Sequence, residues 1–188
     1  MKRVCVAVSV LCLASAAHAT EYLGLDLGAV TKEKAADQLK AAGSAFEDNY
    51  GYKGYGRDLP VFKVSSHERF SKLGRLEEAW LEFSPKGVLY KLQVTYADAG
   101  ETFKVVKDAL DAKYKSAPQR GFGFNQEYKY RDGKTDISLL RNTFGFGADQ
   151  KTTLVYVWTP LVAEVNRAKA AVDEDIKKKN ARKAGSDL

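Results

Sequence analysis

Cysteine is nearly absent from this sequence, and the position of the two that occur makes the absence informative. Both, Cys5 and Cys12, lie within residues 1–19 of the 188-residue chain. The rest of the chain therefore cannot use a thiolate in catalysis, build a zinc site on cysteine or attach haem through a Cys-x-x-Cys-His motif. It cannot form a disulfide either, so its hydrophobic core alone must stabilise the fold.

Histidine is also scarce, because His67 is the only histidine after residue 19. A transition-metal site normally needs several imidazole or thiolate ligands, so we expect no metal. We expect no cofactor, since the glycine-rich stretches "GYKGYG" and "FGFG" lack the Gly-Lys-Ser/Thr ending of a phosphate loop. His67 stands next to two serines and Glu68, but a catalytic triad is assembled by the fold and not by sequence neighbours. We expect it to end a strand in a structural or solvent-facing role.

A long hydrophobic run is missing as well. The apolar stretch near the N-terminus covers only residues 4–17, which is too short to cross a membrane comfortably. It follows Lys2 and Arg3 and runs into "AHA" at 17–19, small residues at the positions that a signal peptidase reads. We predict a cleaved signal peptide over 1–19 and a periplasmic protein without a transmembrane segment. Cys12 could instead mark a lipid-modified start, but the residues before it do not fit a lipoprotein signal.

Excess positive charge is confined to the two ends of the chain. Of the formal net charge of +6, two charges come from Lys2 and Arg3 and four from residues 177–188. Residues 20–176 are therefore neutral overall, unlike a nucleic-acid-binding surface, and we expect no nucleic-acid partner. We predict a single domain over 20–176, followed by a basic, disordered tail over 177–188 that could touch an anionic membrane surface weakly.

The hydrophobic periodicity predicts both strands and helices. The expected strands are 60–66, 76–83, 88–96, 122–131, 135–141 and 152–158, and the expected helices are 31–43, 98–118 and 159–176. Apolar residues on both faces of 152–158 indicate a central strand. A helix, an aromatic-glycine stretch and strands follow one another twice along the chain. We infer an α+β fold, with helices packed on one face of an antiparallel sheet, arranged as two tandem helix-plus-sheet units.

The turn sequences of two hairpins predict which residues of their strands pair. The "SPKG" turn at 84–87 would place Phe83 opposite Val88, and a turn at Asp132–Gly133 would place Tyr130 opposite Thr135. In the second hairpin the aromatic residues at even positions fall on the same face as two aliphatic residues. We expect this face to be buried; its members are Phe122, Phe124, Tyr128, Tyr130, Ile137 and Leu139.

Two short stretches resemble known exported bacterial proteins. "LGLDLGAVTKEKAADQL" is similar to the opening of outer-membrane assembly lipoproteins of the SmpA type and of the β-lactamase-inhibitor-protein-like fold. "LDAKYKSAP" resembles a segment of many periplasmic proteins, with Lys115 where that segment has glycine. The resemblance implies an α+β fold of tandem helix-plus-sheet units. It implies no contact residues for this chain, because the lipoprotein cysteine and the paired cysteines of the inhibitor family are missing.

Aromatic residues flanked by glycine suggest where the protein contacts a partner. "NYGYKGYG" at 49–56 is followed by the similar stretches "GFGFNQEYKY" and "NTFGFG". Rigid rings beside glycine provide contact area at low entropic cost, although a packed turn would have the same sequence. Trp80 lies among charged residues of a strand, either covered by the last helix or exposed as an anchor. The candidate binding residues are Tyr50, Tyr52, Tyr55, Arg57 and Trp80.

These residues favour a non-catalytic periplasmic protein that binds or inhibits another envelope protein or a cell-wall polymer. One alternative is an envelope hydrolase that uses paired carboxylates. Glu77 and Glu78 would lie on opposite faces of a strand, whereas Glu78 and Glu82 would share one. A third possibility is an envelope-assembly accessory whose basic tail approaches lipid.

Overall fold

The computed structural model describes residues 21–48, 59–115, 120–121 and 123–186. The predicted signal peptide lies outside these residues. In chain order the elements are β1 Glu21–Tyr22, β2 Leu25–Asp26, α1 Lys32–Ala41, β3 Ala45–Asp48, β4 Val61–Ser66, α2 Glu68–Ser71, β5 Leu76–Phe83, β6 Leu89–Tyr96, α3 Glu101–Lys113, β7 Asn125–Asp132, β8 Thr135–Asn142, the 3₁₀ turn η1 Gly147–Asp149, β9 Lys151–Trp158 and α4 Thr159–Ser186.

The α+β class is confirmed. Seven strands form one antiparallel sheet in the order β3-β4-β5-β6-β9-β8-β7, and β1 and β2 form a separate two-stranded sheet. Each half of the large sheet is a meander that follows a helix: α1 precedes β3 to β6, and α3 precedes β7 to β9. The last strands of the two meanders, β6 and β9, pair at the centre. The central position expected for residues 152–158 is therefore confirmed.

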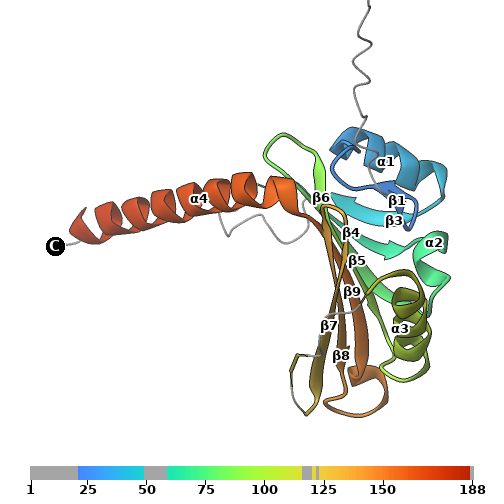
Figure 1. Ribbon diagram of the computed structural model, residues 1–188. Coiled ribbons are helices and arrows are strands. Elements are labelled where there is room, and N and C mark those ends of the chain that lie inside the picture. The colour runs from blue at the N-terminus through green and yellow to red at the C-terminus, as the bar shows by residue number, and fades with distance from the viewer. Residues whose placement is uncertain (1–20, 49–58, 116–119, 122, 187–188) are drawn as a thin grey trace, which may run out of the picture.

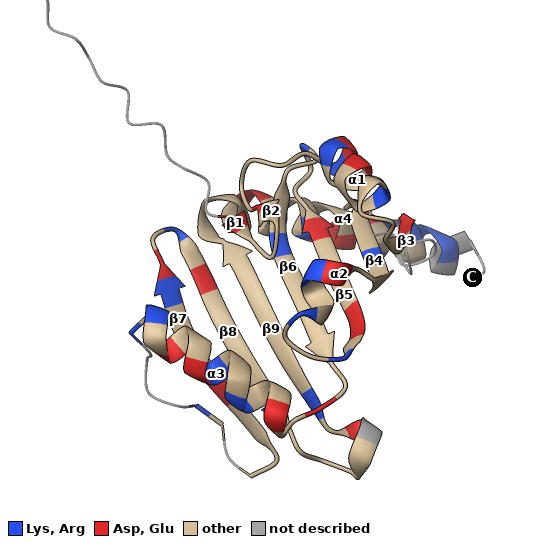
Figure 2. Ribbon diagram, turned by 90° about the vertical axis from the view of Figure 1, so that its right-hand side faces the viewer, with Lys and Arg blue, Asp and Glu red and all other residues tan. Residues whose placement is uncertain are grey.

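Helices α1, α2 and α3 lie on one face of the large sheet, whereas α4 leaves from the opposite side (Figure 1). Figure 2 looks onto the first face, with the three helices in front of the strands. The expectation that all helices pack on one face is thus wrong for α4. This helix follows β9 without a loop, and Val165 is its one fully buried apolar residue among those described. Such a narrow apolar contact cannot cover a sheet.

The core lies between the sheet and α1, α2 and α3. Alternate residues of the strands point toward it and are buried, and Leu39, Phe70 and Val106 of the helices pack against them. The other face of the sheet, here called the open face, carries mainly polar side chains. In the cross-strand row through its middle lie Lys63, Trp80, Gln93, Val155, Ser138 and Lys129.

Both hairpins have the expected faces but a register shifted by two residues. In the first, Leu81 pairs with Leu92, and a bulge between Glu82 and Phe83 adjusts the end near the turn. In the second, Tyr130 pairs with Ile137 instead of Thr135. A shift of two residues leaves a side chain on its own face, so the buried residues around Leu81 and Ile137 are as expected. Beyond the bulge the shift is one residue, so Leu89 joins the core and Tyr90 bonds Glu82 of the open face.

The turn of the second hairpin explains its register. The two loop residues are Gly133 and Lys134, since Asp132 pairs with Thr135. Gly133 has φ +54°, and glycine at the first loop position is what a type II′ turn requires. Asp132 stays in the strand, where its Oδ2 accepts hydrogen bonds from the hydroxyls of Tyr22 and Tyr114, each at 2.9 Å.

The even-numbered aromatic residues are buried only in part. Tyr130 is buried, and Tyr128 is half-buried against Phe103, with ring centroids 5.6 Å apart. Phe124 is exposed, which contradicts the expected burial, because β7 begins one residue later and the sheet no longer dictates where this ring points. Phe122 lies outside the described residues.

The helix ends follow the sequence signals in part. Thr31 caps α1 by accepting a hydrogen bond from the Lys34 amide at 3.3 Å, and Gly43 beyond its end has φ +66°. The structure differs at the C-terminus, where residues 177–186, expected as a disordered tail, continue α4 as helix. An ion pair between residues four apart, Lys178 with Glu174, supports a helix there. None of the helices in the described ranges is long and apolar enough to span a membrane.

Candidate functional site

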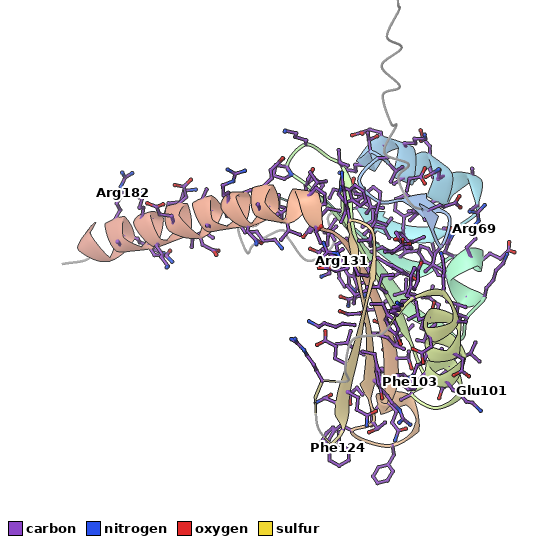
Figure 3. The ribbon with its side chains drawn as sticks, viewed as in Figure 1. Arg69, Glu101, Phe103, Phe124, Arg131 and Arg182 are labelled. Carbon is purple, nitrogen blue, oxygen red and sulfur yellow. The ribbon has the colours of Figure 1, made fainter. Side chains whose placement is uncertain are left out.

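Three phenylalanine side chains are exposed at one end of the large sheet. Phe124 immediately precedes β7, and Phe144 and Phe146 lie in the loop between β8 and β9. Their exposed fractions are 61%, 67% and 92%. The rings of Phe124 and Phe144 meet edge to face with centroids 5.8 Å apart. Figure 3 shows Phe124 at the end of the sheet remote from α4. We call these three side chains the phenylalanine tip.

Hydrogen bonds hold the backbone that carries the phenylalanine tip. The Thr143 amide donates to the Phe124 carbonyl at 2.9 Å and so joins the start of β7 to the end of β8. The Phe144 amide donates to Asn142 Oδ1 at 2.9 Å. The two rings that touch therefore stand on backbone segments that are linked to each other.

The β8–β9 loop is braced from within. Gln150 Nε2 donates to the carbonyl oxygens of Thr143 and Gly145, at 3.4 and 3.2 Å. Gly145 has φ +86°, and a Cβ at this position would lie 2.6 Å from the Asp149 side chain. The "FGFG" motif thus places glycine where the turn requires it and leaves the rings of Phe144 and Phe146 in solvent.

Trp80 of β5 lies on the open face and is half-buried. Its Nε1 donates to Glu78 Oε1 at 2.9 Å, and Lys63 Nζ lies 5.4 Å from the centre of a ring of the indole. Helix α4 packs mainly against β6 and β9. The side chain is therefore tied to its charged neighbours on the sheet, an arrangement between the expected alternatives of full cover and full exposure.

The remaining candidate binding residues, Tyr50, Tyr52, Tyr55 and Arg57, lie outside the described residues. The segment that contains them connects the edge strand β3 to β4. Their role as a contact surface stays a prediction. The structure does not bring Trp80 together with the phenylalanine tip, because Trp80 belongs to β5 and the tip to β7 and the β8–β9 loop.

His67 directly follows the last residue of β4, at the strand end as expected, and is buried. Its Nδ1 lies 2.6 Å from Ser44 Oγ, and its ring meets Phe70 edge to face at 4.3 Å. Burial lowers the pKa of His67 below its usual value, and the charge of Arg69 lowers it further. Ser44, which follows α1, is the serine that hydrogen-bonds the His67 ring, whereas the two serines adjacent in the sequence do not.

The carboxylates of β5 are engaged by cations. Glu78 and Glu82 share the open face, as expected. Glu82 accepts hydrogen bonds from Lys91 Nζ and from the Tyr90 hydroxyl, both at 2.6 Å. Burial alone would raise the pKa of Glu82, but Lys91, Tyr90 and Lys169 together hold it below its usual value. A general acid needs a raised pKa instead, so this carboxylate suits an ion-pair cluster. No group of three or more metal-ligating side chains occurs among the described residues.

The phenylalanine tip is an exposed surface that was not predicted from the sequence. Its signal was the third glycine-aromatic stretch, "NTFGFG", which repeats the pattern of 49–56 in a loop. Alternation of apolar and polar residues predicts that Phe124 is in the core, since it continues the pattern of Tyr128 and Tyr130.

Comparison with known proteins adds no family assignment: the chain matches no protein-family model, no curated protein and no solved structure.

Proposed function

We propose that this protein is an exported, non-catalytic binding protein or inhibitor that attaches to another macromolecule of the cell envelope through exposed aromatic rings. The observation that carries the proposal is the phenylalanine tip. Each of its rings exposes apolar area that gains free energy when a partner covers it, at about 25 cal/mol per Å². Monomeric proteins rarely gather such rings in one place unless they form an interaction site.

The geometry of the tip is that of a preformed binding surface, because its rings are not carried by a flexible loop. The rings stand on backbone that is already hydrogen-bonded, so little loop entropy would be lost when a partner covers them. They protrude from the end of the sheet, which suits insertion into a pocket or groove of the partner. Aromatic anchors in partner pockets are typical hot spots of protein interfaces.

Two parts of the proposal, export to the periplasm and the class of partner, are supported by the sequence. Residues 1–19 have the charge, apolar run and small residues of a signal peptide, which supports export to the periplasm. The neutral charge of residues 20–176 favours an envelope protein or a cell-wall polymer over nucleic acid. Tyr50, Tyr52, Tyr55 and Arg57 remain a second predicted contact surface of the same protein.

Pull-down from envelope extract tests the proposal. The mature protein, a triple variant Phe124→Ser, Phe144→Ser, Phe146→Ser and a triple variant Tyr50→Ala, Tyr52→Ala, Tyr55→Ala are compared as baits. We expect the phenylalanine variant to lose the specific partner, because its exposed anchors are gone. Substitution of exposed side chains should change the unfolding free energy by only about 0.5 kcal/mol per site, so the variant should stay folded.

Val105→Ser provides the matched control. Val105 on α3 is an apolar side chain that is 49% exposed and is not part of the tip. This variant should retain the partner that the phenylalanine variant loses. If the phenylalanine variant captures every protein and polymer that the wild type captures, the tip is not the binding surface and the proposal is wrong.

A further inference from the structure

A cavity of about 810 Å³ lies between the open face of β7 and β8 and the first turns of α4. This volume is typical of small-molecule sites, which span roughly 300–1,000 Å³. Val162 and Ala163 line it from α4, and Val157 lines it from β9. Figure 3 shows Arg131 at the root of α4, far along β7 from Phe124. The cavity is therefore separate from the phenylalanine tip and independent of the function proposed for it.

The lining of the cavity changes from charged at the edge strand β7 to aliphatic at β9 and α4. Arg131 on the edge strand β7 pairs with Asp136 on β8, and Asp136 pairs with Val157 on β9. Lys129 points to the same face from β7. The cations thus lie at one side of the cavity and the aliphatic residues of β9 and α4 at the other. Two strand spacings, about 10 Å, separate the backbones of β7 and β9.

The cations of the cavity are only weakly engaged by protein carboxylates. Lys129 Nζ lies 3.5 Å from Glu127 Oε1, and Arg131 Nη1 lies 3.7 Å from Asp136 Oδ1. The Arg131–Asp136 pair is solvent-exposed and the Lys129–Glu127 pair is partly exposed, and surface pairs at such distances contribute little. Lys115, also at the cavity, forms no ion pair within the described part of the chain. Asp136 is the one carboxylate among the described lining residues, so the cavity keeps an excess of positive charge.

We propose that this cavity binds an alkyl chain with an anionic head group. The head group would accept hydrogen bonds from Arg131 and Lys129 at the edge strand, because charge-assisted bonds to a carboxylate or phosphate are stronger than the exposed pairs that they would replace. The alkyl chain would lie against Val157, Val162 and Ala163. These side chains are aliphatic, which favours an alkyl chain over an aromatic ligand that needs stacking partners.

Titration of the mature wild-type protein with dodecanoate, below its micellar concentration, tests the site. Binding is measured by calorimetry and located by methyl chemical shifts of Val157 and Val162. Dodecyltrimethylammonium has the same chain length and the opposite charge, and it serves as the ligand control. We expect dodecanoate to bind and to shift both valine methyl signals, and the cationic probe to bind at least tenfold more weakly.

Two variants separate the recognition of the head group from that of the chain. Arg131→Gln with Lys129→Gln should weaken dodecanoate binding by about tenfold or more, since it removes charge-assisted hydrogen bonds. Ala163→Phe should abolish binding by filling the apolar side of the cavity. Lys104→Gln is the matched control, because Lys104 is an exposed lysine on α3, on the other side of the sheet. It should bind as the wild type does.

The wild-type titration tests the cavity without any substitution, so it is decisive even if a variant does not fold. Absence of dodecanoate binding, or equal binding of the cationic probe, would overturn it. Flotation with vesicles of anionic phospholipid then distinguishes the two sources of such a ligand. Flotation of the wild type that Ala163→Phe abolishes would point to a membrane lipid. Dodecanoate binding without flotation would point to a free alkyl anion.

Discussion

His67 shows how the environment of one side chain determines its chemistry. The sequence places it between two serines and a glutamate, whereas the fold buries it against Ser44 and Phe70. Burial disfavours the imidazolium form, and the nearby Arg69 disfavours it further, so the pKa lies below the usual value of 6.5. The sequence predicted a strand end correctly, but not the burial of the ring, nor its hydrogen-bond partner Ser44, which lies 23 residues away.

This pKa shift makes stability depend on pH in a predictable direction. The unfolded chain binds a proton at His67 more readily than the folded protein, so protonation favours unfolding as pH falls below about 6.5. We expect the unfolding free energy to decrease between pH 7.5 and pH 5.5, and to decrease less in His67→Gln. Urea denaturation at both pH values measures the difference. His67 is the only histidine after residue 19, so an equal decrease in both proteins would contradict the predicted shift.

The hairpins show which properties of an element follow from its own sequence. Alternation of apolar and polar residues correctly predicted the buried faces around Leu81 and Ile137. It could not determine the register, because a shift of two residues preserves every face. Nor could it locate the start of β7, and for that reason Phe124 was assigned to the core. Register and strand ends depend on the turn and on partners such as the tyrosines that bind Asp132.

Helix α3 begins with a side-chain cap. Asp98 accepts hydrogen bonds from the amides of Thr102 and Gly100, at 2.6 and 2.8 Å. These bonds hold the pKa of Asp98 below its usual value. Asp98→Ala should therefore lower the unfolding free energy by about 1 kcal/mol at neutral pH, as measured by urea denaturation.

Two comparisons test this role of Asp98. Asp108→Ala removes an exposed carboxylate from the same helix and should have a smaller effect. Because the folded state favours the ionised carboxylate, the difference between wild type and Asp98→Ala should also decrease as pH falls below about 4. A difference that persists unchanged in acid would show that the carboxylate does not act as a cap.

At the scale of the whole molecule, the repeated order of elements along the chain predicted the two halves of the sheet. The structure adds how they join: β6 and β9, the last strand of each half, pair along their length. The direction of α4 could not be predicted, because an apolar stripe runs along it as in a packed helix, formed by Leu161, Val165, Ala168, Val172 and Ile176. Among its described residues, however, Val165 is the one apolar side chain that is fully buried. The sheet continues through both halves without a boundary, so they share one core.

A shared core predicts that the two halves unfold together. Leu154 of β9 is buried between Val94 on β6 and Leu139 on β8, where it touches both halves. Leu154→Ala should lower the unfolding free energy by about 2–5 kcal/mol. Leu154 lies where the two halves of the sheet pair, so its substitution should destabilise both halves. The amide resonances of Ala79 in β5 and Ile137 in β8 should therefore disappear at the same urea concentration in the variant, as in the wild type.

Leu140→Ala is the matched control for this substitution. Leu140 lies on β8 and is 36% exposed on the open face, so the same change should cost much less there. Separate midpoints for Ala79 and Ile137 in Leu154→Ala would show that each half folds on its own. The β6–β9 pair would then be an interface between two domains, because a continuous core cannot lose one side while the other stays folded.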